Sequence, residues 1–359
     1  MGFLGVDQWP ALLTFAGSMA LCMVLLRITR VVGKQCGLVD KPTSRKHHRG
    51  HIPLVGGASI FITYVALCVG AEHSQAVIAA SGLLMIVGIA DDYIDLSPLS
   101  RLVFQSLAAG ILVIGGGYQI LTVGNLLGEN PVLMGGVVAI LFSIVCVIGV
   151  INAINMIDGA DGLAGGIVTI SISALLFIAT SYDNNHALVT GLWTVLGATI
   201  AFLLFNTGFL GSRQKVFLGD SGSMFLGIVL AAHFISMSQG DTAYMTPVVA
   251  GWIFGLPLMD SISVMVGRVI KGSSPLKAGR DHLHHLLVDN GMSNAGCVGI
   301  MLIFHGSLVL IGLLGNHFEF PMFIMFWGFV ALTVAHHFIT PKLILQFSER
   351  AERRSRRYS

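Results

Sequence analysis

The residues best suited to chemistry are acidic and amide side chains, grouped at three points of an otherwise apolar chain. They lie in ADDYIDLSPLSR at 90–101, INAINMIDGADGL at 151–163 and KVFLGDSGS at 215–223. Acidic residues near membrane-length apolar segments are costly and usually mark function. The purely structural alternative is an Asp in the first turn of a helix or in an Asp-Gly turn. Because all three groups fall on one side of the predicted membrane spans, a shared functional site is favoured.

Helical spacing would align several of these side chains. Asp91 and Asp95 are four residues apart, and Asn155, Asp158 and Asp161 recur at intervals of three. Each set would therefore share one face of any helix that continued past the membrane boundary. Like charges this close repel one another unless a cation lies between them. Oxygen-rich Asp and Asn groups suit Mg²⁺, which keeps waters for substrate phosphates, so we predict a Mg²⁺ site with Mn²⁺ as an alternative ion.

The segment FLGDSGS at 217–223 adds a phosphate-binding element. Asp220 is flanked by glycine at the start of a predicted span, where the N–H groups of a helix N-terminus form a cradle for anions. The same residues would also make an ordinary capping turn, so the segment carries weight only beside the acidic groups. The GGG at 115–117 falls on the opposite side of the predicted membrane and is not assigned to this site.

Two predicted loops on the same side are rich in Lys, Arg and His. The first reads VDKPTSRKHHRGHIPLVGG at 39–57, and the second reads KGSSPLKAGRDHLHHLL at 271–287. In the second loop Arg280 is followed by His282, His284 and His285. Zinc is the rival interpretation, but no Cys or Glu stands at ligand spacing nearby. Beside an acidic metal site, a group of His and Arg favours the binding of a diphosphate.

Composition places these groups in an integral membrane protein. Of the 359 residues, 54% are hydrophobic and 11% are charged, whereas a soluble domain carries about 25% charged residues. The mean hydropathy is +0.82, and apolar stretches of about 20 residues recur along the chain. We predict an all-α polytopic bundle of about eleven transmembrane helices with a cytoplasmic-face active site. The predicted spans are 10–32, 54–71, 75–90, 98–116, 132–153, 163–181, 187–208, 221–238, 244–267, 296–315 and 321–341.

The distribution of charge orients this bundle. All 20 Lys and Arg residues lie in or beside one alternate set of predicted loops, and the opposite loops carry only acidic charges. By the positive-inside rule, the basic side is cytoplasmic, the N-terminus lies outside and the C-terminus lies inside. The basic tail at 342–359 is expected to contact anionic lipid headgroups rather than nucleic acid. No repeat or linker divides the chain, so we predict a single domain over 1–359, in which the five Cys are core residues.

The motifs resemble a known family, the polyprenyl-phosphate N-acetylhexosamine-1-phosphate transferases. The resemblance covers roughly residues 33–290 and rests on the order and spacing of VDKP, IPLVGG, DDYIDLSP, NAINMIDGADGL, KVFLGDSGS and HLHHL. It is closest to the branch that transfers GlcNAc 1-phosphate to undecaprenyl phosphate. The peptidoglycan branch typically has three adjacent His, whereas this chain has HLHH preceded by GRD.

The resemblance implies a reaction and a set of site residues. A sugar 1-phosphate would pass from a UDP-N-acetylhexosamine to undecaprenyl phosphate in the bacterial inner membrane, releasing UMP and beginning a surface glycan such as O-antigen or common antigen. Mg²⁺ would be required. GalNAc, QuiNAc or FucNAc as the sugar, the less favoured phospho-MurNAc-pentapeptide, and a homodimer stay open. The implied catalytic residues are Asp91, Asp92 and Asp158; the metal ligands are Asp220, Asn155 and Asp92; the substrate-binding residues are Arg49, Asp161, Phe217, Gly219, Arg280, His282, His284 and His285.

The residues allow two mechanisms, and two other classes of protein share some of these features. In a one-step displacement, Asp91 or Asp92 orients or deprotonates the lipid phosphate; the rival route passes through an aspartyl phosphate. A secondary transporter would place its carboxylates near mid-span, and only Asp260 in GLPLMDSIS does so. A CDP-alcohol phosphatidyltransferase would need an Ala-Arg pair and a later Asp pair that DGADGLAGG lacks. A sugar-phosphate transferase is therefore favoured.

Overall fold

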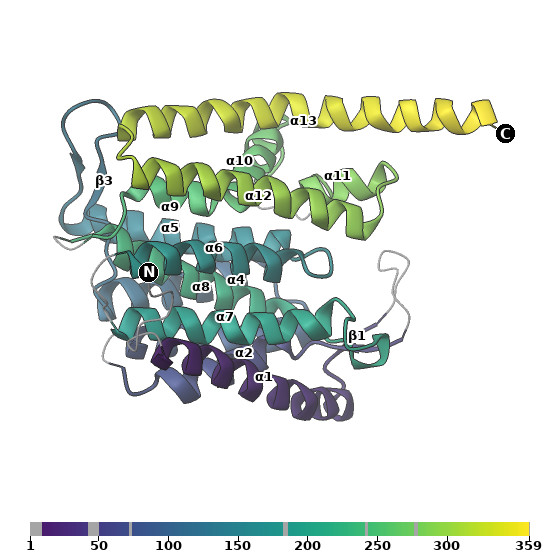
Figure 1. Ribbon diagram of the computed structural model, residues 1–359, viewed down its shortest axis with the longest axis horizontal. Helices are drawn as coiled ribbons and strands as arrows, with labels where there is room; N and C mark the ends of the chain where they lie inside the picture. The colour runs from purple at the N-terminus through teal and green to yellow at the C-terminus, as the bar shows by residue number, and fades with distance from the viewer. Residues whose placement is uncertain are drawn as a thin grey trace. The chain divides into compact units, whose positions relative to one another are not determined.

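Helices dominate the structure, a computed structural model that describes residues 9–41, 50–71, 74–181, 186–240, 243–275 and 279–358 (Figure 1). The chain forms two compact units. Unit 1 comprises residues 1–121 and 134–245, and unit 2 comprises residues 122–133 and 246–359. Each unit is described by itself below.

Unit 1 is a helical bundle with one short pair of strands. The strands β1 (Val39–Asp40) and β2 (Ile52–Pro53) pair antiparallel. A π-helical turn, η3 (Ile111–Gly115), continues α4, and a 3-10 turn, η4 (Ser212–Gln214), precedes α8. The helices are α1 (Trp9–Cys36), α2 (Gly56–Cys68), α3 (Gln75–Ile94), α4 (Pro98–Gly110), α5 (Gly136–Ile157), α6 (Leu163–Thr180), α7 (His186–Asn206) and α8 (Gly219–Ser238).

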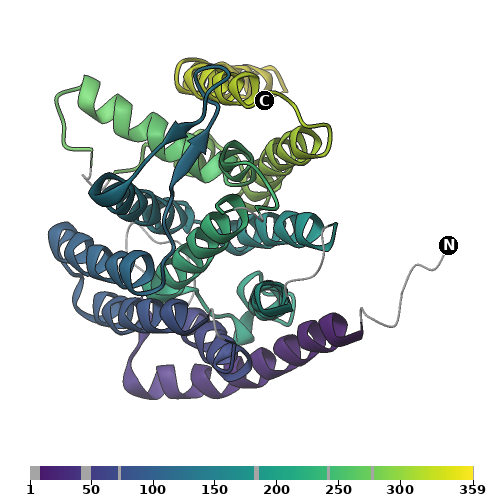
Figure 2. The same cartoon turned by 90° about the vertical axis from the view of Figure 1, so that its left-hand side faces the viewer.

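Helix α8 is the buried centre of unit 1, packed against α2, α3 and α5 (Figure 2). Small residues allow these helices to approach closely, as is typical of helix packing in membranes. A Cβ added at Gly57 would lie 2.2 Å from Cα of Gly222, and one added at Gly88 would lie 2.2 Å from Cα of Ser221. These contacts bring the start of α8 against α2 and α3, and so fix where the Asp220 backbone lies.

Unit 2 contains a β-hairpin and five helices. The strands β3 (Thr122–Gly124) and β4 (Val132–Leu133) pair antiparallel. Trp252 donates its indole N–H to the carbonyl oxygen of Met325 at 3.1 Å, which ties α9 to α13. The helices are α9 (Pro247–Ile253), α10 (Gly255–Ile270), α11 (Leu283–Asp289), α12 (Asn294–His317) and α13 (Met322–Tyr358).

The predicted class, a polytopic all-α membrane protein, is confirmed. Within the described ranges, nine helices are long and apolar enough to cross a membrane, and the bent pair α9–α10 makes a tenth. The predicted span at 54–71 corresponds to α2, an apolar helix of only 13 residues. Each of the remaining predicted spans overlaps one of the longer helices or the bent pair.

The predicted span at 244–267 is wrong in its shape. It consists of two helices, α9 and α10, that meet at an angle of 84°. Pro257 has no N–H to donate to the carbonyl of Ile253, so the hydrogen-bond ladder of α9 cannot continue through this point. Gly255 allows the close packing that follows, since a Cβ there would lie 2.9 Å from Leu308 Cδ1.

Candidate active site

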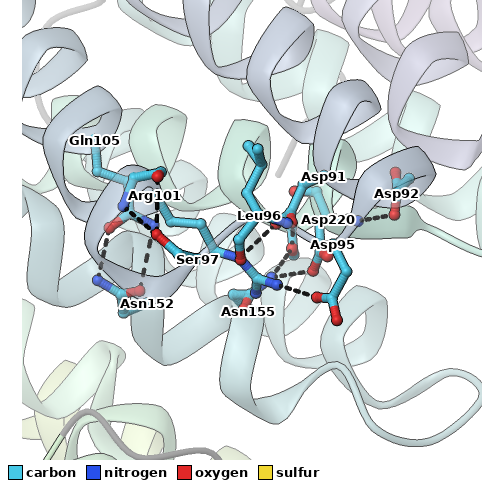
Figure 3. Close-up of polar contacts among 12 residues, drawn as sticks. Asp91, Asp92, Asp95, Leu96, Ser97, Arg101, Gln105, Asn152, Asn155 and Asp220 are labelled. Carbon is cyan, nitrogen blue, oxygen red and sulfur yellow. Dashed lines mark hydrogen bonds and ion pairs between the residues drawn. The ribbon is translucent and has the colours of Figure 1, made fainter.

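An acidic site forms in unit 1 where three helix ends meet (Figure 3). Asp91 and Asp92 lie in the last turn of α3, Asn155 lies in the last turn of α5, and Asp220 lies in the first turn of α8. The sequence assigned these four residues, together with Asp158, to the catalytic and metal-binding group. The structure brings these four together.

Direct hydrogen bonds join the three helices at this site. The backbone N–H of Asp220 donates to Asp92 Oδ1 at 3.0 Å. Asn155 Nδ2 donates to Asp220 Oδ1 at 2.6 Å and to Ser223 Oγ at 2.9 Å. Asn155 of α5 therefore orients the carboxylate of Asp220. The carboxylate of Asp92 lies at the N-terminus of α8, where the free N–H groups of the helix favour negative charge.

Glycine is required at position 219 for this approach. Its φ is +77°, a left-handed conformation that side chains with a Cβ rarely adopt. A Cβ at Gly219 would also lie 2.7 Å from Asp92 Oδ2. The Gly-Asp pair of the motif thus serves the contact between α3 and α8.

Asp91 is a buried carboxylate with its own cation. It is 4% exposed, and its Oδ1 accepts the backbone N–H of Leu96 at 2.7 Å. Arg101 places Nε 2.7 Å from Asp91 Oδ2 and Nη2 3.0 Å from Asp95 Oδ1 (Figure 3). The site prediction missed Arg101, although it is the only Lys or Arg between Arg49 and Arg213 in the sequence.

The expected helical faces do not form beyond the membrane boundary. Helix α3 ends at Ile94, and Asp95 adopts a left-handed conformation with φ of 51°, so Asp91 and Asp95 meet through Arg101 rather than along a helix. Helix α5 likewise ends at Ile157, with Asp158 as its cap residue. The predicted single face of Asn155, Asp158 and Asp161 is therefore wrong, because the Asp-Gly pairs turn the chain.

The two Asp residues after α5 have different surroundings. Burial, followed by the charges of Asp220, Asp92 and Asp161, raises the pKa of Asp158 to about 8. Asp161 instead forms an ion pair with Lys215. Asp158 therefore belongs electrostatically to the acidic site, and Asp161 lies on its edge.

The predicted pocket residue Phe217 links the first cationic loop to the motif before α8. Its backbone N–H donates to the carbonyl oxygen of Pro53 at 2.8 Å, and its own carbonyl accepts the N–H of Gly56 at 2.9 Å. Lys215 lies 5.3 Å from the centre of the Phe217 ring, within the range of a cation–π contact. The predicted substrate-binding residue Arg49 lies outside the described residues.

The donor set of the acidic site fits a hard divalent cation. Among the described residues, no three His, Cys, Asp or Glu side chains are already close enough together to coordinate an ion. Asp92 accepts the backbone N–H of Asp220, the Asp220 carboxylate accepts from Asn155, and the described residues supply no Lys or Arg ion pair to either carboxylate. Burial first, and then the charges of Asp220 and Asp92, raise the pKa of Asp158 beside them. Mg²⁺ uses one or two carboxylates and retains its waters, so Asp220, Asp92 and Asn155 suit it.

In unit 2, the predicted His cluster is held by buried Asp260. Asp260 is 3% exposed; its Oδ2 lies 2.8 Å from His282 Nδ1, and its Oδ1 accepts the N–H of Leu283 at 2.9 Å. Because Leu283 begins α11, one carboxylate both caps this helix and orients the ring of His282. The sequence left open a structural role for Asp260, and these contacts supply one.

The remaining side chains of the His cluster differ in accessibility. His284 is 3% exposed, and burial lowers its pKa to about 3, so it is neutral. His285 is half-buried, and burial followed by the charge of Arg280 lowers its pKa. Arg280 is exposed and pairs with Asp289, with Nη2 2.6 Å from Oδ1. Arg280 and His285 are therefore the members of the cluster that solvent reaches most easily.

Fold and site together define a polytopic membrane protein whose acidic centre is assembled from helix ends. A sequence model of glycosyl transferase family 4 matches residues 74–238, which include the whole acidic site. Proteins named undecaprenyl-phosphate α-N-acetylglucosaminyl 1-phosphate transferase match nearly the full chain. The one from Yersinia pestis is 34% identical over 346 residues, 94% of this chain and 94% of that protein.

Two further relatives of the same name agree. The protein from Escherichia coli O157:H7 is 32% identical over 93% of this chain and 92% of its own length. The protein from Haemophilus influenzae is 31% identical over 95% of this chain and 97% of its own length. The chain belongs to this family of glycosyl-1-phosphate transferases, which confirms the resemblance first seen in the motifs.

Proposed function

We propose that this protein transfers GlcNAc 1-phosphate from UDP-GlcNAc to undecaprenyl phosphate. An oxygen of the lipid phosphate attacks the β-phosphorus of the donor, the bond from that phosphorus to the bridging oxygen breaks, and UMP leaves. The product is a lipid diphosphate sugar. The single observation that carries the proposal is the meeting of Asp91, Asp92, Asn155 and Asp220 at one end of a membrane-spanning bundle.

The proposed role of the acidic site is to hold a cation that neutralises the negative charge of the donor. Mg²⁺ held by Asp220, Asp92 and Asn155 would neutralise the diphosphate of the donor. Asp91 is already bonded to Leu96 and Arg101, so its proposed role is to hold α3 and orient the lipid phosphate through Arg101. Asp92 has no Arg partner among the described residues and is the better candidate to accept a proton.

Arg280 supplies positive charge for a polyanion, and the neighbouring His rings supply N–H donors. We assign His282, His285 and Arg280 to the phosphate groups of the donor, with Asp260 as the positioning residue for His282. Arg280 would exchange the exposed carboxylate of Asp289 for phosphate, which is a small cost at a solvent-exposed pair. His284 is buried, and its proposed contribution is to pack beside His285, whose ring centre lies 4.0 Å away.

The placement in the cell follows from the charges. We propose that the chain is one polytopic domain in the bacterial inner membrane, with the N-terminus outside and the acidic site and C-terminus at the cytoplasm. The basic end of α13 would contact anionic lipid headgroups.

A transfer assay tests the proposed function. Purified protein is given Mg²⁺, undecaprenyl phosphate and one of a panel of radiolabelled donors: UDP-GlcNAc, UDP-GalNAc, UDP-QuiNAc, UDP-FucNAc and UDP-MurNAc-pentapeptide. We expect lipid-soluble label from UDP-GlcNAc above the others. No transfer from any donor would overturn the proposal, and UMP release without lipid acceptor would replace the one-step mechanism with an aspartyl phosphate route.

A further inference from the structure

A cavity lies in unit 1, near the end of α8 that is remote from Asp220. Its volume is about 700 Å³, inside the range of roughly 300–1,000 Å³ that is usual for ligand sites. Ser236 lines it, and at about 1.5 Å rise per residue this residue lies about 24 Å along α8 from Asp220. The cavity is therefore separate from the acidic site.

Glycine and aliphatic residues make up just over half of the lining, and neutral polar and aromatic side chains supply the rest. Three of the six Tyr in the chain contribute, together with three Gln. No described residue of the lining is Lys, Arg, Asp or Glu. Tyr offers a rigid, amphipathic ring, and a Gln amide can both donate and accept hydrogen bonds. Gln75 is exposed, whereas Gln119 Nε2 donates to the carbonyl oxygen of Val113 at 3.4 Å and Gln239 Oε1 accepts the backbone N–H of Leu121 at 2.9 Å. The residues are Tyr64, Tyr118, Tyr244, Gln75, Gln119 and Gln239.

The inner wall of the cavity is built from ordered, buried groups. Tyr64 is 3% exposed and meets the Phe225 ring edge-on, with centres 5.7 Å apart. His233 is 5% exposed, with Nδ1 2.7 Å from the carbonyl oxygen of Val229. Gly191 keeps space in front of both, because a Cβ there would lie 3.2 Å from His233 Nε2 and 3.7 Å from the Tyr64 hydroxyl.

Another wall is formed by the GGG at 115–117, which the acidic site does not use. Its first residue, Gly115, ends η3, and π-helical turns are rare and are frequently found at functional sites. Gly117 has φ of +72°, so the chain turns here in a conformation that favours glycine. The peptide backbone can therefore reach the cavity without intervening side chains.

We infer that this cavity binds a neutral saccharide of one or two sugar units. Tyr rings can cover the C–H faces of a sugar, while the exposed Gln75 amide and backbone groups pair with its hydroxyls. Burying a charged ligand beside these neutral groups would be costly. Under the proposed orientation the cavity opens on the outer side of the membrane, so the saccharide would arrive from there. The inference does not depend on the transfer reaction.

Binding to the full-length protein tests the inference. The protein is reconstituted in nanodiscs with saturating UMP. Calorimetric titrations use maltose and N,N′-diacetylchitobiose, with glycerol 3-phosphate as the charged comparator. Ser236→Phe fills the cavity from α8, whereas Ser173→Phe changes an exposed Ser on α6 that is not part of the lining. GlcNAc 1-phosphate transfer by each variant is measured separately to show that it is folded.

We expect at least one disaccharide to bind, with about tenfold weaker affinity in Ser236→Phe and unchanged affinity in Ser173→Phe. If Ser236→Phe does not fold, Gln75→Ala, at an exposed lining position, takes its place and should weaken binding. No saccharide binding to the wild type, equal binding in the blocked variant, or preference for the charged comparator would overturn the inference.

Discussion

The acidic residues of the two units differ in whether a cationic side chain lies beside them. In unit 2, Asp260, Asp281 and Asp289 each have a His or Arg partner within 2.8 Å. In unit 1, Asp91 is the one member of the central group that pairs with a Lys or Arg of the described residues, and Asp92, Asp158 and Asp220 repel one another. Paired carboxylates position the chain. Unbalanced carboxylates at converging helix ends instead create a demand for a cation, which is what a diphosphate-transferring site needs.

The largest effect is expected when the unbalanced group loses a carboxylate. Asp220→Asn removes a proposed metal ligand and should lower kcat for GlcNAc 1-phosphate transfer by about 10²–10³-fold. Asp95→Asn is the matched control, because Asp95 is a charged neighbour whose side chain is 96% exposed. Both variants should insert and purify normally, and wild-type turnover by Asp220→Asn would remove this residue from the site.

A second variant disturbs the geometry of the site without changing its charge. Gly219→Ala should strain a position with φ of +77° and push a methyl group toward Asp92. Strain of about 1–3 kcal/mol at this turn should lower transfer roughly tenfold or more. Gly149→Ala in α5, where a Cβ would meet nothing within 4 Å, should be silent. Equal activity of the two variants would show that the α3–α8 contact tolerates a side chain.

In unit 2, loss of a paired carboxylate should lower the stability of the fold. Asp260→Asn leaves His282 without its buried carboxylate and should cost about 1–3 kcal/mol of unfolding free energy. The melting temperature of Asp260→Asn should therefore be measurably lower than that of the wild type. Displacement of His282 should also raise KM for the UDP-sugar. Asp289→Asn breaks only an exposed pair and should leave thermal unfolding unchanged. Identical curves for the two variants would contradict the assigned positioning role.

The smallest predicted effect is a dependence of stability on pH without divalent ions. Folding raises the pKa of Asp158 from 3.8 to about 8, so the folded state holds this proton more tightly than the unfolded state. The stabilising contribution is present in full at low pH and is lost as pH rises through about 8. Melting temperature of Mg²⁺-free protein should therefore fall from pH 5 toward pH 8, and Asp158→Asn should flatten this slope. A slope of the opposite sign would contradict the assignment.

The sequence predicted much of the fold and the central group of the site. Apolar stretches of membrane length identify the helices, because each must bury its backbone hydrogen bonds within itself. The motif order brought Asp91, Asp92, Asn155 and Asp220 together before any geometry was known. Their hydrogen bonds through the N–H of Asp220 and the amide of Asn155 required the packed helices.

What the sequence did not predict depends on contacts between distant segments. Arg101 appeared to flank the membrane, but the turn at Asp95 folds it back onto Asp91. In the sequence, Asp260 looks like an isolated charge in the middle of a span, because its partner His282 lies 22 residues away. In the structure, Asp260 lies near the start of the separate helix α10. The two-helix shape of the ninth span likewise depends on Pro257 and on packing against Leu308.

The most direct test of the central claim is a measurement of Mn²⁺ binding by electron paramagnetic resonance in the absence of substrate. The account predicts Mn²⁺ that is bound by the wild type, displaced by Mg²⁺, lost in Asp220→Asn and retained in Asp289→Asn. Bound Mn²⁺ that is unchanged in Asp220→Asn, or lost equally in both variants, would contradict the assignment of the acidic helix ends as the cation site.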